Sequence, residues 1–161
     1  LDLVAAHDNV IVLRTFSKIF GMAGMRCGYA IGQASTLRGL RGDQMWDPVN
    51  ALSLVAARTS LGDERHVAVH RRRNAETRSW TVEEMKKLGL DVLPSEANFI
   101  MVSLGREVSP VIAAMRARGV AVGRLFPAMP QHMRVTIGRP EEMRRFVTEL
   151  AAVMGRSAQA A

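Results

Sequence analysis

The chain has 161 residues, and 48% of them are hydrophobic, which is enough to bury a core in one domain or two small ones. Its formal net charge of +7 would suit nucleic acid or anionic small molecules. The densest basic run, RHVAVHRRRN at 65–74, has no interleaved aromatic residues and matches no nucleic-acid-binding motif, so we expect a solvated helix face and no nucleic-acid partner.

No stretch resembles a membrane span or a signal peptide, and a single cysteine, Cys27, excludes an internal disulfide. We therefore expect a cytoplasmic protein with no membrane partner. The chain starts with leucine rather than methionine and runs at once into an apolar strand, which indicates a fragment.

The first elements are two strands and a helix. NVIVLRTF at 9–16 contains four consecutive apolar residues, which predicts a parallel strand covered on both faces. CGYAIG at 27–32 predicts a second strand. Asp47 and Pro48 fit the N-cap and first turn of a helix that ends near Gly62.

A long polar stretch follows at 63–88, without glycine or proline, and it predicts a helix that ends at Gly89 and is long enough to bridge two domains. Strands are then predicted at 97–104 and 120–126. Between them, 109–119 predicts a helix with Ser109 as its cap and Pro110 at its first position.

The final strand and helix have the clearest periodicity. HMRVTIG at 132–138 alternates as a half-buried strand does. The last helix begins at Pro140, and apolar residues recur along it at helical spacing: Met143, Phe146, Val147, Leu150, Ala151 and Met154.

This order of elements predicts an α/β chain in two parts. Residues 1–62 are interpreted as the remnant of a larger domain, and 63–88 as a connecting helix. Residues 89–155 are interpreted as a small C-terminal α/β domain, followed by a frayed tail at 156–161.

A lysine at the end of an apolar strand carries the first chemical hypothesis. A buried lysine is costly unless it is paired, deprotonated or covalently engaged. Apolar neighbours of Lys18 are expected to desolvate its amine and favour the neutral form, which attacks carbonyl groups. Those neighbours are Phe16, Ile19, Phe20 and Met22.

The residues around Lys18 also suggest an anion site. Ser17 offers a hydroxyl, and Arg26 follows two glycines, Gly21 and Gly24, that allow tight turns, so serine and arginine form a candidate phosphate clamp. A nucleophilic amine beside a phosphate site needs a ligand with both an aldehyde and a phosphate. Pyridoxal 5'-phosphate carries both.

Several segments then indicate a family. TFSK followed by AGMRCGY closely resembles the cofactor-lysine signature of the fold-type I pyridoxal-phosphate enzymes, the class I/II aminotransferases, and is nearest to the histidinol-phosphate aminotransferases. PVNALSLVAA, SEANFIMV and MRVTIGRPEEMRRF resemble further segments of that family in the expected order.

The resemblance implies a role for four residues. Lys18 would hold the cofactor as a Schiff base and then move the substrate proton, while Ser17 and Arg26 would bind the cofactor phosphate. Arg134 would bind a substrate carboxylate or phosphate ester. The position of Arg134 supports this role independently, because the residue lies opposite the apolar face of its strand and a guanidinium can form two parallel hydrogen bonds to an anion.

The family also implies an amino donor, a 2-oxo acid acceptor and a homodimer. Its other cofactor-binding groups belong farther upstream of the lysine than this chain extends. The chain therefore resembles the C-terminal part of an aminotransferase, and we expect residues 1–161 alone to be inactive.

Simpler interpretations stay open for each candidate. Lys18 can extend its amine to solvent, Arg26 can form an ordinary ion pair, and Arg134 can be a solvated strand residue. Arg124 and Asn98 are weaker candidates for the substrate pocket and for a turn, respectively. No metal site is predicted, because His66 and His70 lack a third ligand and are expected to be exposed helix residues.

Two rival functions also remain. A decarboxylase of the threonine-phosphate type resembles this chain and differs in which bond at the substrate α-carbon is broken. A non-catalytic sensor with an aminotransferase-like domain is the rival from another class, although no DNA-binding segment is recognised in the sequence.

Overall fold

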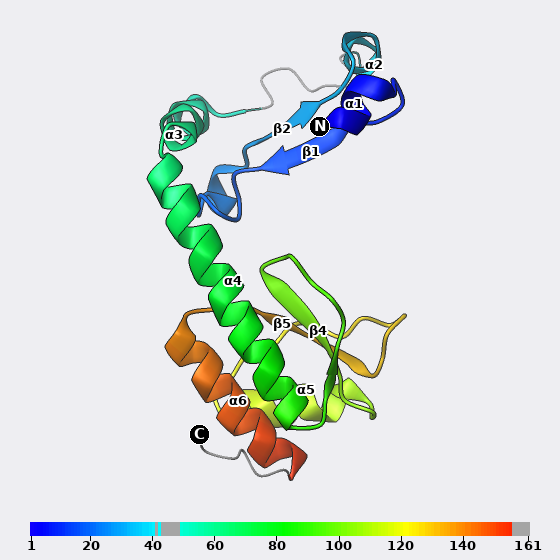
Figure 1. The fold of residues 1–161 in the computed structure, drawn as a ribbon, viewed down its shortest axis with the longest axis vertical. Helices are drawn as coiled ribbons and strands as arrows, with labels where there is room; N and C mark the ends of the chain where they lie inside the picture. The colour runs from blue at the N-terminus through cyan, green and yellow to red at the C-terminus, as the bar shows by residue number, and fades with distance from the viewer. Residues whose placement is uncertain (41, 43–48, 156–161) are drawn as a thin grey trace. The chain divides into compact units, whose positions relative to one another are not determined.

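The computed structural model describes residues 1–40, 42 and 49–155 (Figure 1). The described residues fall into two units, one within residues 1–70 and the other within residues 71–161, and the division lies within the long helix α4 (Glu64–Lys87). The predictions for Asp47, Pro48 and the tail at 156–161 lie outside the described residues. No helix in the described part of the chain is long and apolar enough to cross a membrane.

The first unit is built around a two-stranded ribbon, β1 (Val12–Thr15) and β2 (Gly28–Ile31). Short helices α1 (Asp2–Ala6) and α2 (Ala34–Leu40) flank the ribbon in the sequence, and neither was predicted. The Gln33 side chain donates to the Val4 carbonyl (2.9 Å) and so links the start of α2 to α1.

The prediction of a parallel, fully covered first strand is wrong. β1 and β2 are antiparallel, with Val12 opposite Ile31 and Thr15 opposite Gly28. The connection between them carries only a short 3₁₀ turn, η1 (Ala23–Met25), and parallel pairing usually needs a longer crossover that contains a helix. Leu13 is 77% exposed, so the described residues do not cover this strand on both faces.

Helix α3 (Ala51–Leu61) contributes the remaining packing of the first unit. Its N-cap is Asn50, whose side chain accepts a hydrogen bond from the Leu52 N–H (2.8 Å), and Gly62 follows its last residue as expected. The Ser53 hydroxyl donates to the Met25 carbonyl (2.6 Å). A small buried cluster joins α3 to the ribbon: Phe16, Met22, Cys27 and Ala57.

The second unit packs helices on one face of an antiparallel sheet (Figure 1). The strand order is β3 (Asp91–Val92), β4 (Phe99–Ser103) and β5 (His132–Thr136), and the packed helices are the C-terminal half of α4, α5 (Val108–Ala117) and α6 (Pro140–Met154). The core contains Met85, Ile100, Val102, Met115, Met133, Val135 and Leu150, among others.

The clearest sequence predictions are confirmed in this unit. Helix α4 ends just before Gly89, which has a φ of +68° that glycine adopts without strain. On β5, Met133 and Val135 are buried, as is Ile137 beyond it. All six periodic apolar residues of α6 are buried: Met143, Phe146, Val147, Leu150, Ala151 and Met154.

Two predictions in this unit need correction. Helix α5 begins at Val108 rather than after Ser109, and its N-cap is Glu107. Val108 is buried, and its N–H, which has no partner within the helix, donates to the Pro130 carbonyl (3.0 Å). The segment 120–126 forms no strand. Gly123 donates one backbone hydrogen bond to Arg134 (2.9 Å), and this does not extend into a ladder.

Candidate functional site

Three of the four predicted site residues lie on or next to the loop between β1 and β2. The ladder continues one step beyond the strands, because the Phe16 N–H donates to the Cys27 carbonyl (3.2 Å). The Met22 N–H then donates to the Phe16 carbonyl (3.1 Å). Phe16, Met22 and Cys27 are buried, so the base of the loop is anchored in the core of the first unit.

Ser17 is fixed by the last residue of β1. Its N–H donates to Thr15 Oγ1 (3.1 Å), and Thr15 Oγ1 donates to Ser17 Oγ (2.9 Å). Because Ser17 Oγ accepts in this pair, its own proton stays available to an incoming acceptor. The side chain is therefore oriented and still able to donate a hydrogen bond.

Lys18 is exposed, which corrects the expectation that its neighbours bury the amine. Phe16 and Phe20 pack against each other (ring centroids 5.2 Å apart) in or against the buried cluster instead of enclosing the amine. Among the described residues the amine has no hydrogen bond or ion pair, whereas Lys86 and Lys87 pair with Glu83 and Glu84. The Lys18 amine is thus free to react, but the described residues do not shield it from water.

The backbone of Lys18 is part of a tight turn. Its carbonyl accepts a hydrogen bond from the Gly21 N–H (2.9 Å), and Gly21 has a φ of +65°. An L-residue with a side chain rarely adopts this conformation, so the predicted turn function of Gly21 is confirmed. Gly24 is in η1 and has no positive φ.

Arg26 has the one positive φ found at a non-glycine position in the described residues (φ 50°, ψ 48°). This left-handed conformation costs roughly 1–3 kcal/mol and occurs often at binding sites. Arg26 Nη1 donates to the Ala23 carbonyl (2.8 Å), which leaves the other N–H groups of the guanidinium available. It forms no ion pair among the described residues, contrary to the simpler interpretation.

Arg134 belongs to the second unit and lies on the face of β5 opposite the core, as predicted. Its guanidinium carbon lies 4.1 Å from the centre of the Phe99 ring on β4. A cation over an aromatic face is stabilised and held in orientation. Arg134 is therefore half-buried and oriented rather than a freely solvated strand residue.

The weaker candidates acquire simple structural roles. Arg124 is exposed, and its guanidinium lies 5.4 Å from the Phe126 ring centre. Asn98 accepts a hydrogen bond on its backbone carbonyl from the Ile137 N–H (2.9 Å), which fixes the start of β4. Among the described residues, no group of three or more His, Cys, Asp or Glu side chains is placed to hold a metal ion.

His66 was expected to be exposed, and the structure shows otherwise. It is half-buried, and its Nε2 lies 2.8 Å from the Ile19 carbonyl oxygen, next to Lys18 in the sequence. No local pattern signals a contact between residues 47 positions apart. His70 is exposed as expected.

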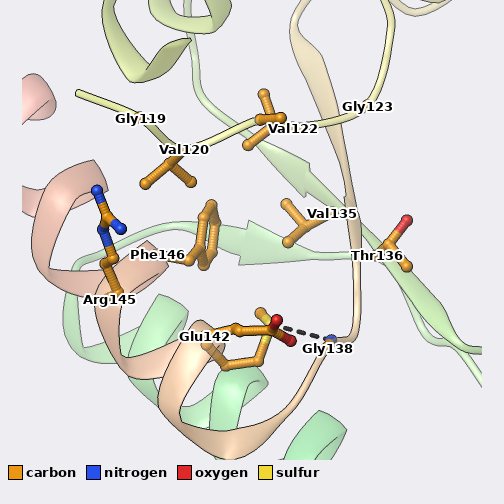
Figure 2. A pocket seen from close by; sticks show the side chains of 12 residues that line it. Gly119, Val120, Val122, Gly123, Val135, Thr136, Gly138, Glu142, Arg145 and Phe146 are labelled. Carbon is orange, nitrogen blue, oxygen red and sulfur yellow. Dashed lines mark hydrogen bonds between the residues drawn. The ribbon is translucent and has the colours of Figure 1, made fainter. Parts of the chain in front are cut away.

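A separate cavity of about 520 Å³ lies in the second unit (Figure 2). Val120, Val122, Val135 and Phe146 give it an apolar lining. Its two charged side chains are already engaged locally, because Arg145 donates to the Arg118 carbonyl (3.0 Å) and the Glu142 carboxylate accepts from the Arg139 N–H (2.7 Å). None of the predicted site residues lines this cavity.

Comparison with known proteins identifies the family of the chain. The aminotransferase class I and II family matches residues 1–150. Histidinol-phosphate aminotransferase from Symbiobacterium thermophilum is 40% identical over 154 residues, which are 95% of this chain and 43% of that protein.

Solved structures match the fold as well. A protein from Erwinia carotovora atroseptica superposes with a TM-score of 0.87 at 29% identity, over 94% of this chain and 44% of that one. Histidinol-phosphate aminotransferase from Sinorhizobium meliloti, solved with pyridoxal 5'-phosphate, superposes with a TM-score of 0.82 at 24% identity, over 92% of this chain and 42% of that one.

The fold is therefore that of part of a fold-type I pyridoxal-phosphate transferase, as the sequence predicted. The chain belongs to the aminotransferase class I and II family, and it spans less than half the length of the relatives it matches.

Proposed function

We propose that the full-length protein containing this chain is a pyridoxal-phosphate-dependent aminotransferase. It would transfer an amino group between an amino acid or amino-phosphate substrate, of the histidinol-phosphate type, and a 2-oxo acid. The observation that carries this proposal is the similarity to histidinol-phosphate aminotransferases along 95% of the chain, which includes the Lys18 loop.

The residues of the loop fit the cofactor chemically. An aldehyde needs an accessible amine, and Lys18 is exposed with no partner among the described residues. A phosphate needs several N–H or O–H donors, and Ser17 and Arg26 both keep unused donors. Ser17 and Lys18 are adjacent, and the hydrogen bond between Phe16 and Cys27 brings Arg26 back to the same end of the ribbon.

Each residue then has a defined task. Bound pyridoxal 5'-phosphate supplies an electron sink that stabilises negative charge at the substrate α-carbon. Lys18 would provide the amine that holds the cofactor, and the same amine would remove and return the proton at the substrate α-carbon. Ser17 and Arg26 hold the phosphate and so fix the position of the reacting carbon relative to the Lys18 amine.

Arg134 is proposed to bind the anionic group of the substrate. Its guanidinium can form two parallel hydrogen bonds to a carboxylate or a phosphate. The contact with Phe99 limits the orientations available to the guanidinium before the substrate arrives.

Further proposals follow from the family and concern the whole protein. We propose that it is a cytoplasmic homodimer that acts in amino-acid biosynthesis, and the free, buried Cys27 is compatible with a reducing compartment. Residues 1–62 would belong to a large cofactor-binding domain, and residues 89–155 would form the small domain. Residues 63–88 would form the helix that connects the two domains.

The test is a product assay on the purified full-length protein with pyridoxal 5'-phosphate, histidinol phosphate and 2-oxoglutarate. We expect glutamate and the oxo product in equal amounts, and none from the Lys18→Ala variant. Release of carbon dioxide from an amino acid phosphate, without an oxo product, would instead identify the decarboxylase. Absence of turnover with cofactor bound would favour the sensor. We also expect no turnover from residues 1–161 alone.

A further inference from the structure

The first turn of α4 places one imidazole against the loop that carries Lys18. Asp63 Oδ1 accepts a hydrogen bond from the His66 N–H (2.9 Å), which fixes this turn. The imidazole Nε2 lies 2.8 Å from the Ile19 carbonyl oxygen. A carbonyl only accepts, so Nε2 carries the proton and donates it.

The imidazole is also held by its ring faces. The Phe20 ring is stacked with it (centroids 6.4 Å apart, planes 12° apart), and Phe20 in turn contacts Phe16 of the buried cluster. The His70 ring lies 4.1 Å away along the helix. These contacts restrict the direction in which Nε2 points and so orient the donor toward Ile19.

This hydrogen bond reaches a segment that has few other restraints. Among the described residues, His66 is the one side chain from outside residues 15–27 with a hydrogen bond to residues 17–21. On the other side of Lys18, Thr15 holds Ser17. The Lys18 backbone is thereby fixed on both sides, before it and after it.

We infer that His66 is a positioning residue for Lys18. By donating to the Ile19 carbonyl, it fixes the peptide that follows Lys18 and limits the positions that the Lys18 amine can reach. This inference rests on the proposed function, because it assumes that the Lys18 amine is the reacting group. A displacement of about 1 Å in a reacting group can lower a rate by about a hundredfold.

The experiment separates the hydrogen bond from ring packing, in the full-length protein loaded with pyridoxal 5'-phosphate. His66→Phe keeps an aromatic ring against Phe20 but removes the donor. His66→Gln removes the ring but can still donate from its amide. Arg65→Ala, an exposed neighbour on the same helical turn, is the control. For each variant, kcat, KM and the pH titration of the visible absorbance of the lysine-bound cofactor are measured.

We expect His66→Phe to lower kcat by about ten- to a hundredfold, with KM changed less than about threefold. We also expect it to shift the pH at which the visible absorbance of the lysine-bound cofactor changes. His66→Gln should restore most of the lost kcat, and Arg65→Ala should match the wild type. Equal activity of His66→Phe and wild type would overturn the inference. Equal loss in both His66 variants would also overturn it, because ring packing would then be the cause.

A second readout does not depend on activity. Hydrogen exchange of the cofactor-free protein should be faster in the peptide containing residues 17–21 for His66→Phe than for His66→Gln. Unchanged exchange in both variants would contradict the inference. If the wild type itself fails to attach the cofactor at Lys18, the proposed function fails first, and this outcome is distinct from a defect confined to the variants.

Discussion

The two units of the chain differ in how they use their apolar side chains. The second unit buries a continuous core between one sheet face and three helices. The first unit buries only a small cluster among its described residues, and leaves large apolar side chains such as Leu13, Leu52 and Val55 exposed. Yet the first unit carries Ser17, Lys18 and Arg26, and the second carries only Arg134.

With the proposed site, the larger buried core and most of the proposed chemistry lie in different units. A unit with little buried apolar surface gains little free energy to offset the entropy of ordering its chain. The loop that carries Lys18 therefore lies in the unit whose described residues bury the least apolar surface. We expect the rest of the full-length protein to supply what is missing, since this chain covers 43% of its relative from Symbiobacterium thermophilum.

The largest expected effect comes from separating the units. Residues 64–161, which retain all of α4, should show a cooperative thermal unfolding transition by circular dichroism, and residues 1–63 should show none. The reason is that, among the described residues, the second unit buries a large core whereas the first unit buries only a small cluster. A cooperative transition in residues 1–63 would contradict the comparison.

A matched pair of leucine substitutions sharpens the comparison within residues 1–161. Leu150 is 0% exposed on α6, and Leu54 is 53% exposed on α3. Leu150→Ala should lower the free energy of unfolding by about 2–5 kcal/mol because it leaves a cavity. Leu54→Ala should change it by less than about 0.5 kcal/mol in urea denaturation. Equal losses would show that α3 is packed as firmly as α6.

Arg134 is the point where the stable unit is proposed to contribute chemistry. Arg134→Gln in the full-length protein should raise KM for the anionic substrate about 10- to 100-fold, because a charged hydrogen bond is worth about 1.5–3 kcal/mol. Arg116→Gln, on an exposed arginine of α5, is the control and should leave KM unchanged. An unaltered KM in Arg134→Gln would remove this residue from the substrate site.

The smallest expected effect concerns pH and the start of α6. The Arg139 N–H, and then its side chain, lower the pKa of the Glu142 carboxyl from its usual 4.5. Because the pKa is lowered in the folded state, the ionised carboxylate stabilises the fold at pH values above 4.5. This contribution is lost as the pH falls through the pKa of the folded state.

The corresponding measurement is the melting temperature of Glu142→Gln relative to wild type across pH. The difference should be small and constant near neutrality, and should shrink below about pH 4.5. A difference in melting temperature that persists at low pH would indicate lost packing rather than lost charge.

Local patterns in the sequence were sufficient for some elements. The apolar spacing of α6 and the alternation on β5 predict which face each element buries, and the structure confirms both buried faces. The turn at Gly21 was also readable, because few other residues adopt its backbone conformation. Helices α1 and α2 were missed because they are short and have no buried stripe.

The errors share a different cause, which is dependence on distant residues. The direction of β1 depends on its pairing with β2, and the exposure of Lys18 depends on where Phe16 and Phe20 pack. The contact of His66 with Ile19 joins residues 47 positions apart. For the candidate site, the choice of Ser17, Lys18, Arg26 and Arg134 stays a prediction, and the contacts that orient these residues were not predicted from the sequence.

The most direct measurement is borohydride reduction of the full-length protein with pyridoxal 5'-phosphate, followed by peptide mapping. We expect the reduced cofactor on Lys18, the lysine of this chain whose amine has no ion pair among the described residues, and none on Lys86 or Lys87. Modification of another lysine, with Lys18 unmodified, would contradict the central claim.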